Sequence, residues 1–252
     1  MMRLVETETP AFTAFCADDV LGARILAALR SYANLPGENA QCWVQTDELE
    51  SITAALSCVD GFGILFAAQA ADFEELAAFL KVSPCVKLQY DAAARIPCVR
   101  TSPSRLMRFH ASARPTVRGV AIEPAEELNE VYDLLVRCDF PGFTKNRGAW
   151  LADMALRIRR KTAHSWILRQ KACAAATASA LSLTDGIAFL GAVGTLPEKR
   201  GQGLAGALVE QIAAELQAAG KRVYLCCRKE LQGFYESVGF TAAGEWVCGS
   251  LR

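Results

Sequence analysis

A glycine-rich turn with two adjacent cations stands late in the chain. It reads Thr195-Leu196-Pro197-Glu198-Lys199-Arg200-Gly201-Gln202-Gly203-Leu204-Ala205-Gly206. Residues 187–194 before it form an apolar run of strand length, and after it Leu208, Ile212 and Leu216 recur on one helical face. Glycines let backbone N–H groups turn toward one point, a helix start adds unpaired donors, and Arg200 adds a forked cation. The turn therefore predicts a site for a phosphorylated ligand.

The spacing of this turn distinguishes two kinds of phosphate-binding loop. Gly201-x-Gly203-x-x-Gly206 fits the dinucleotide fingerprint, but that motif places its first glycine directly after the strand. Here residues 195–200 intervene, which argues against a Rossmann domain. Arg200-x-x-Gly203-x-Ala205 instead resembles the Arg/Gln-x-x-Gly-x-Gly/Ala signature of the GNAT superfamily of acyl-CoA-dependent N-acyltransferases. In that superfamily the loop holds the pyrophosphate of coenzyme A.

The sequence that follows agrees with this resemblance. Residues 223–227 are a short apolar run typical of a strand, and residues 233–240 are similar to the superfamily's Tyr-Glu-x-x-Gly-Phe ending. Arg228 departs from the pattern, because many members carry at that place an Asn that meets the pantetheine arm. Arg228 either reaches a phosphate or is simply solvated. The resemblance covers about residues 113–252.

The resemblance implies a set of site residues and a co-substrate, acetyl-CoA. The residues expected to contact it are Val193, Gly194, Thr195, Arg200, Gly201, Gln202, Gly203, Leu204, Ala205 and Gly206. A backbone N–H near Val193, where strand pairing should be interrupted, is expected to polarise the acyl carbonyl, and Tyr235 to protonate the departing sulfur. The alternative for Tyr235 is a core residue with a tethered hydroxyl. Asp139, Glu245 and a water chain are the candidates for the base.

Two functions of different classes follow from these residues. The first is an acyltransferase of the kind that transfers groups other than amino-acyl groups. It moves an acetyl or other small acyl group to a primary amine, on a small molecule or a peptide, by direct attack in a ternary complex. The second is a non-catalytic acyl-CoA-binding or regulatory module, in which the turn persists while Tyr235 only packs.

The fold class expected is α+β, with a mostly antiparallel sheet flanked by helices in the C-terminal half. Helical periodicity predicts helices over 126–138 and 150–160, and strands are expected over 166–169 and 177–183, with a hairpin turn at Asp185-Gly186. By resemblance the connection 139–144 borders the acceptor pocket. Its alternative interpretation is a hydrophobic staple between the two helices.

The N-terminal half has a similar but weaker pattern. Strands are expected over 42–46, 51–59, 61–68 and 86–90, with a helix over 72–80. The link 69–72 contains neither glycine nor cation and carries Asp72, so it should not bind a pyrophosphate. The hypothesis is a smaller, degenerate GNAT-like copy, with an unrelated α/β domain as the alternative. We expect a linker at 100–104 and domains over 1–112 and 113–252.

Composition excludes several other classes. The 27 basic and 27 acidic residues cancel, which argues against a nucleic-acid partner, and the basic cluster at 157–161 is expected to be a solvated face. No apolar run has transmembrane length. The ten cysteines include no Cys-x-x-Cys and follow no signal-peptide core, so a reducing, cytoplasmic location is expected. Cys226 and Cys227 are expected in the core, and no metal site is expected with two histidines.

Overall fold

The protein is described from a computed structural model, which covers residues 1–33, 40–94, 96–110, 120–140, 143 and 146–251. The chain divides into two compact units. Unit 1 comprises residues 1–106, 227–229 and 243–252, and unit 2 comprises residues 107–226 and 230–242. The last ten residues, which the sequence assigned to the second domain, therefore belong to unit 1. The predicted boundary between residues 112 and 113 lies outside the described residues.

Unit 1 has three helices, five complete strands and parts of others among its described residues. The complete strands are β1 (Met2–Leu4), β2 (Ala40–Thr46), β3 (Ile52–Val59), β4 (Phe62–Ala67) and β5 (Lys87–Asp91), and the unit also contains the first part of β6 (Arg100–Phe109) and the C-terminal part of β12 (Phe240–Ser250). The helices are α1 (Pro10–Cys16), α2 (Val20–Tyr32) and α3 (Phe73–Val82), with a 3-10 turn, η1 (Ala92–Ala94). Each helix begins at a side-chain cap, provided by Thr9, Asp19 and Asp72 respectively.

The sheet of unit 1 has the strand order β1-β2-β3-β4-β5-β12. Neighbouring strands are antiparallel except β4 and β5, which are parallel. Leu76 and Leu80 of α3 pack in one cluster with Ala54, Leu56 and Cys58 of β3. Because side chains alternate along a strand, the residues between them point to the opposite face. There α1 and α2 pack against β3, so the sheet has helices on both faces.

Unit 2 has the same kinds of elements. The strands are the end of β6 (Arg100–Phe109), β7 (Val120–Pro124), β8 (His164–Gln170), β9 (Cys173–Leu183), β10 (Ile187–Thr195), β11 (Arg222–Cys227) and the start of β12. The helices are α4 (Leu128–Arg137), α5 (Arg147–Arg159), α6 (Leu204–Ala218) and α7 (Gln232–Glu236), with 3-10 turns η2 (Pro197–Lys199) and η3 (Lys229–Leu231).

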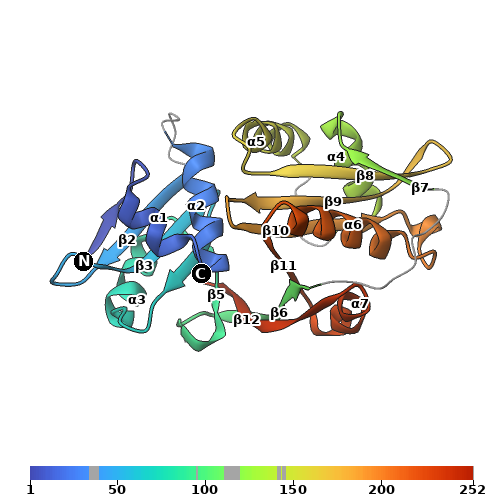
Figure 1. Cartoon of the computed structure of the whole chain (residues 1–252). Coiled ribbons are helices and arrows are strands. Elements are labelled where there is room, and N and C mark those ends of the chain that lie inside the picture. The colour runs from blue at the N-terminus through green and yellow to red at the C-terminus, as the bar shows by residue number, and fades with distance from the viewer. Residues whose placement is uncertain (34–39, 95, 111–119, 141–142, 144–145, 252) are drawn as a thin grey trace. The chain divides into compact units, whose positions relative to one another are not determined.

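The sheet of unit 2 has the order β6-β11-β10-β9-β8-β7, with β10 and β11 parallel and β7 to β10 antiparallel. Figure 1 shows α6 running beside β9 and β10, against which it packs. Leu208 and Ile212 of α6 are fully buried. Val131 and Leu135 of α4 pack on Ile167 of β8. The mixed α/β class and the mostly antiparallel sheet flanked by helices are thus confirmed.

The two units share one order of elements. Unit 1 runs β1-α1-α2-β2-β3-β4-α3-β5, and unit 2 runs β7-α4-α5-β8-β9-β10-α6-β11. The sequence predicted the second half of this order in unit 1 but missed α1 and α2. Their signals were Thr9 followed by Pro10, a helix start, and Asp19 before apolar residues at helical spacing.

The predicted linker at 100–104 is wrong, because these residues begin β6. The stretch contains two serines and Pro103, a composition typical of loops. The strand is fixed instead by distant partners: Ser104 Oγ donates to the Trp246 carbonyl oxygen, and Arg105 pairs with Glu245 at 2.6 Å. Pro103 is exposed there. Contacts across about half of the chain leave no trace in local composition.

Candidate functional site

The strand that leads into the predicted turn is interrupted by a bulge. Between the pairs Gly191–Ser179 and Gly194–Thr177, Ala192 and Val193 of β10 face a single residue of β9. Ala192 has a φ of 50°, in the left-handed region. A bulge leaves one residue without a ladder partner and bends its strand. The interruption expected near Val193 is present.

The parallel pairing of β10 with β11 ends before this bulge. The last pair is Leu190 with Leu225, although β10 continues to Thr195 and β11 to Cys227. Backbone groups of β10 beyond Leu190 are therefore outside the ladder on the β11 side. This is the stretch that the sequence assigned to the acyl carbonyl and the pantetheine arm.

The N-terminus of α6 is formed by left-handed glycines. Gly203 is the N-cap, with φ 75°, and Gly201 has φ 77°. No side chain caps α6, so its first N–H groups have no side-chain acceptor. A Cβ added at Gly201 would meet no heavy atom within 4 Å, so the space beside it is open. The backbone thus presents donors at the positive end of the helix dipole.

The side chains of this turn divide into exposed and buried groups. Gly201, Gln202 and Gly203 are exposed, whereas Leu204 and Gly206 are buried and Ala205 is half-buried. Leu204 and Gly206 therefore belong to the core of unit 2. Any contribution they make to a ligand comes from their backbone.

Gln170, the last residue of β8, forms hydrogen bonds with the side chains of Lys199 and Gln202. Lys199 Nζ donates to Gln170 Oε1 at 3.1 Å, and Gln170 Nε2 donates to Gln202 Oε1 at 3.1 Å. Gln170 therefore braces both sides of the glycine turn. Sequence reasoning missed it, because no local pattern links residues so far apart.

Arg200 is held by backbone carbonyls. Its Nε donates to the Thr195 carbonyl oxygen at 3.2 Å, and its Nη2 donates to the Cys138 carbonyl oxygen at 3.1 Å. A guanidinium has five N–H donors, so these two bonds leave others for a ligand. The cation is therefore fixed in place at the turn.

Gly194 and Thr195 lie where β10 meets the end of α4. A Cβ at Gly194 would approach Cys138 Sγ to 3.1 Å, which explains the absence of a side chain. Thr195 Oγ1 is buried and has no hydrogen-bond partner among the described residues. An unpaired buried hydroxyl costs free energy unless a ligand or water satisfies it.

Tyr235 lies in α7 and is 7% exposed. Its ring contacts Phe234 and Phe240, with centroids 5.0 Å and 6.0 Å away. The Tyr-Glu-x-x-Gly-Phe segment thus folds as a short helix followed by a buried strand start. The ring is part of the core, as the structural alternative predicted, and the role of its hydroxyl stays a prediction.

The other candidate residues are dispersed. Arg228 is exposed between β11 and η3. Asp139 is exposed at the end of α4 with φ 49°. Glu245 belongs to unit 1 and pairs with Arg105 at 2.6 Å. Asp139 directly follows Cys138, whose carbonyl oxygen accepts from Arg200.

The predicted aromatic connection joins α4 and α5. Phe143 packs between Tyr132 and Trp150, with ring centroids 5.2 Å and 5.7 Å away. Phe140 packs in the same cluster as Leu135. These contacts agree with a hydrophobic staple. Residues 141, 142 and 144 lie outside the described part, and a border to the acceptor pocket stays a prediction.

The remaining composition-based expectations concern metals, charges and membranes. Across the described ranges no group of three or more His, Cys, Asp or Glu residues is arranged to hold a metal ion. Of the basic cluster, Arg157 pairs with Asp153 and donates to the Leu181 carbonyl oxygen, while Arg159 and Arg160 are exposed. Cys227 is buried, as expected of a core residue. Within the described chain, no helix has the length and hydropathy needed to cross a bilayer.

The corresponding helix start in unit 1 is closed by its own side chains. Asp72 Oδ1 accepts from the backbone N–H groups of Glu74 and Glu75, both at 3.0 Å. Gln45 Oε1 accepts from the Asp72 N–H at 2.9 Å. The donors that an anion would need are occupied by a carboxylate, which would also repel it.

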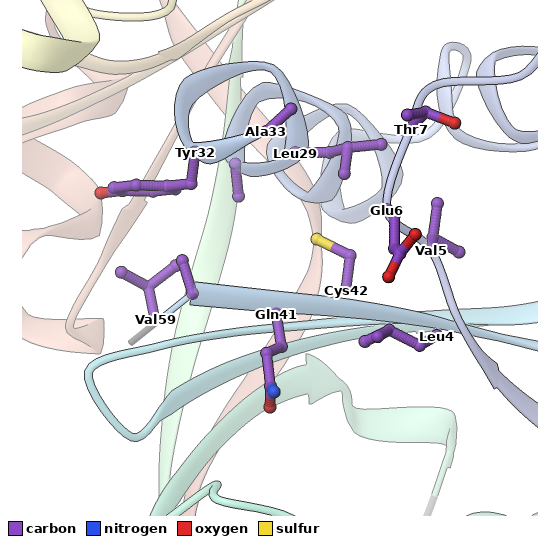
Figure 2. A pocket seen from close by; sticks show the side chains of 12 residues that line it. Leu4, Val5, Glu6, Thr7, Leu29, Tyr32, Ala33, Gln41, Cys42 and Val59 are labelled. Atoms are coloured by element: carbon purple, nitrogen blue, oxygen red, sulfur yellow. The ribbon is translucent and has the colours of Figure 1, made fainter. Parts of the chain in front are cut away.

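A cavity of about 380 Å³ lies elsewhere in unit 1, between α2 and the segment after β1 (Figure 2). Figure 2 shows Cys42 pointing from β2 toward α2, and burial raises the pKa of its thiol to about 12. The cavity includes Val59, which lies beside the turn that joins β3 to β4. The helix α3 begins after the opposite end of this strand pair, so its N-terminus is at the other end of the hairpin from the cavity. It contains no residue of the predicted site.

Unit 2 thus combines an interrupted strand, a helix start without a side-chain cap between left-handed glycines, and a Tyr-bearing helix on a mostly antiparallel sheet. The family model described as acetyltransferase (GNAT) family matches residues 128–240. These residues form a GNAT acetyltransferase domain, which supports a transferase. No curated protein matches the chain.

Solved structures share the fold over both units. A putative GNAT-family acetyltransferase from Novosphingobium aromaticivorans DSM 12444 is 18% identical, with 92% of this chain and 97% of that chain covered and a TM-score of 0.57. A GCN5-related N-acetyltransferase from Sphaerobacter thermophilus is 16% identical, with 100% and 96% covered and a TM-score of 0.59. A tandem GNAT protein from the clavulanic acid biosynthesis pathway is 12% identical, with 98% and 97% covered and a TM-score of 0.57. The shared element order of the two units agrees with a tandem arrangement.

Proposed function

We propose that the protein is an N-acetyltransferase that moves an acetyl or other small acyl group from acetyl-CoA to a primary amine, by direct attack in a ternary complex. The observation that carries this proposal is the uncapped N-terminus of α6, bounded by left-handed Gly201 and Gly203 and preceded by the bulge at Ala192 and Val193. It combines donors for a diphosphate with free backbone groups where a thioester would lie.

The residues present fit acetyl-CoA as co-substrate, without a metal. The N–H groups at Gly201 to Gly206 and the remaining donors of Arg200 suit a diphosphate, and the open space at Gly201 leaves room for it. In the part of the chain that the structure describes, Thr195 Oγ1 has no hydrogen-bond partner, and the polar pantetheine arm would supply one. Acetyl-CoA contributes a thioester, whose acyl carbon is open to attack by an amine.

The reaction then has four tasks, which the chain's own groups or a bound water perform. A backbone N–H near Val193 stabilises negative charge on the acyl oxygen, because the bulge frees it from the ladder. Gly194 and Thr195 hold the arm in position. Tyr235 donates a proton to the sulfur that leaves. Asp139, or water, takes the proton that the amine loses.

The proposed acceptor is a small-molecule or peptide amine bound near Phe140 and Phe143. The balanced net charge favours neither nucleic acid nor a membrane as partner. A cytoplasmic location is part of the same proposal and rests on the cysteine pattern of the sequence.

Calorimetric titration with acetyl-CoA tests the binding site. Gly201→Val should abolish detectable binding, because a branched side chain would fill the space beside the donors. Gly220→Val is the matched control: Gly220 also has a left-handed φ, of 82°, and open space around it, but follows the C-terminus of α6. Equal affinity in the two variants would reject the proposed site.

A non-catalytic acyl-CoA-binding module is the second candidate, and the burial of Tyr235 in an aromatic cluster favours it. Release of thiol from acetyl-CoA, measured with a panel of primary amines, separates the two functions. An acyltransferase should release thiol with at least one amine. Binding without turnover on the whole panel would support the module.

A further inference from the structure

Arg200 is the point where the acetyl-CoA loop is attached to α4. Its guanidinium binds the Thr195 carbonyl oxygen, at the end of β10, and the Cys138 carbonyl oxygen, at the C-cap of α4. A cation at a helix C-terminus is favoured by the helix dipole and by the unpaired carbonyls of the last turn. The contact with Cys138 is therefore a favourable one in the protein without ligand.

Two further contacts join the same parts of unit 2. A Cβ at Gly194 would approach Cys138 Sγ to 3.1 Å, so β10 and the end of α4 are in close contact. Arg137 Nη2, in the last turn of α4, donates to Glu198 Oε1 at 2.7 Å. That pair is largely exposed and should contribute little. The end of β10 and the loop are thus connected to α4 at Gly194 and Glu198 as well as at Arg200.

The end of α4 leads directly into the aromatic connection. Leu196, at the start of the loop, packs in one cluster with Leu135, Cys138, Phe140 and Phe143. The amides of Cys138 and Phe140 are bonded to carbonyls of the last turn of α4, at Leu134 and Leu135. The loop and the residues proposed to border the acceptor are therefore joined by a continuous set of contacts.

We infer that Arg200 is a positioning residue that couples the acetyl-CoA loop to the α4–α5 connection, and so couples donor binding to acceptor binding. This inference rests on the proposed function. If Arg200 only bound the phosphates of the donor, its loss would affect only reactions with an acyl donor that carries phosphate. A residue that holds the loop against α4 acts on any acyl donor and on the acceptor.

The deciding experiment compares two acetyl donors with one accepted amine. Acetyl-CoA carries the diphosphate, and S-acetylpantetheine has the same thioester arm without phosphate. Arg200→Ala should lower kcat/KM with S-acetylpantetheine by about tenfold and raise the KM of the amine, the scale of losing one hydrogen bond to a charged group. A loss confined to acetyl-CoA, with the S-acetylpantetheine reaction at the wild-type rate, would overturn the inference.

Two other variants make the result specific. Lys199→Ala removes the neighbouring cation, which binds Gln170 and not α4, so it should leave the S-acetylpantetheine reaction unchanged. Arg200→Lys keeps the charge but lacks the planar fork that reaches two carbonyls, so it should resemble Arg200→Ala with this donor. Wild-type behaviour of Arg200→Lys with this donor would count against the coupling.

Hydrogen exchange on the protein without ligand gives a readout independent of catalysis. The amides of Cys138, Asp139 and Phe140 should exchange faster in Arg200→Ala than in wild type or Lys199→Ala. If wild type neither binds nor uses acetyl-CoA, the proposed function fails, while the link between loop and helix is still judged by this exchange. Unchanged exchange at these three amides would show that Arg200 does not hold α4.

Discussion

The N-termini of α3 and α6 hold the same place in two units with one order of elements, but they present different chemistry. At α3 the carboxylate of Asp72 accepts from the Glu74 and Glu75 N–H groups at 3.0 Å. At α6 the N-cap is Gly203, and no side chain occupies the donors. The residue at the N-cap thus determines whether the first N–H groups of the helix are bonded to a side chain or left without one.

Two other features of the proposed site are also present in unit 2 and missing from the described part of unit 1. β4 pairs with β3 in continuous register from Val59–Phe62 to Ala54–Ala67, whereas β10 has a bulge. After β5 the chain forms the 3-10 turn Ala92–Ala94, whereas α7 carries Tyr235 after β11. Unit 1 therefore has the order of elements without the left-handed glycine turn, the interrupted strand or the helix that carries the proposed proton donor. This supports the degenerate-copy hypothesis and shows that the fold alone does not supply the site.

The largest effect is expected from the residue that unit 1 lacks altogether. Tyr235→Phe keeps the ring contacts with Phe234 and Phe240 but removes the hydroxyl. Turnover should fall by about 100- to 10,000-fold, the usual contribution of a positioned general acid, while acetyl-CoA affinity is unchanged. Steady-state rates with an accepted amine and calorimetry on the same protein measure the two quantities.

Phe234→Leu is a control for packing at the same helix, because it alters the aromatic contact and leaves the hydroxyl of Tyr235 in place. It should retain most of the turnover. Near wild-type turnover in Tyr235→Phe would show that Tyr235 only packs in the core. One of the proposed chemical differences between the two units would then be lost.

A second prediction converts the start of α6 into that of α3. Gly203→Asp should weaken acetyl-CoA binding by about 10- to 100-fold, because a carboxylate at the N-cap would take the donors and repel the diphosphate. Gly203→Asn is the matched control, since Asn also tolerates a left-handed φ and caps helices without a charge. Calorimetric titration should show a clearly smaller loss for Asn than for Asp. Equal losses would mean that the backbone geometry, and not the charge, distinguishes the two helix starts.

The sequence predicted most of unit 2 because its signals are local. Residues 187–194 form a continuous apolar run, the glycines at 201 and 203 need a left-handed backbone, and Leu208 and Ile212 follow helical spacing. Each of these patterns is set within a few residues. The structure has a strand, a turn and a helix there, and an interrupted ladder near Val193.

The parts that the sequence did not predict depend on distant contacts. β6 is stabilised by Trp246 and Glu245, about 140 residues away along the chain, and its own serines and proline indicate a loop. The bond from Arg200 to the Cys138 carbonyl oxygen spans 62 residues. The burial of the Thr195 hydroxyl without a hydrogen-bond partner among the described residues also depends on the three-dimensional packing. No local periodicity encodes such relations.

A third prediction tests the comparison from unit 1. Asp72→Ala removes the cap of α3 and should lower the free energy of unfolding by about 1 kcal/mol, the usual contribution of an N-cap side chain. Asp72→Asn keeps an acceptor for the Glu74 and Glu75 amides and should remain close to wild type. Urea unfolding followed by circular dichroism measures both changes.

The same Asp72 variants should still bind one acetyl-CoA per chain. Opening the donors of α3 does not supply left-handed glycines, a bulge or a cation beside them. A second binding event in calorimetry of Asp72→Ala would mean that only the Asp72 carboxylate prevents unit 1 from binding acetyl-CoA. The backbone of unit 1 would then still be able to bind the ligand.

The smallest expected effect is on the free energy of unfolding, from a Glu–Arg ion pair of a type that occurs in both units. Glu8 pairs with Arg30 in unit 1 and Glu130 with Arg169 in unit 2, at 2.7 Å and 2.6 Å. The hydrogen bond from Arg169 holds the pKa of Glu130 below its ordinary value of 4.5. A carboxylate with a lowered pKa in the folded state contributes stability above the unfolded pKa, and the contribution is lost as the pH falls through the folded value.

Glu130→Gln should therefore lower the free energy of unfolding at pH 7 by less than about 1 kcal/mol, since both side chains are partly exposed. The difference from wild type should shrink below pH 4.5, where the wild-type carboxylate begins to lose its charge. Glu127→Gln is the control, because Glu127 is the exposed N-cap residue of the same helix and its side chain makes no cap bond. Urea midpoints at pH 7 and pH 3 measure the effect. A difference that persists undiminished at pH 3 would show that Glu130 acts by packing rather than through its charge.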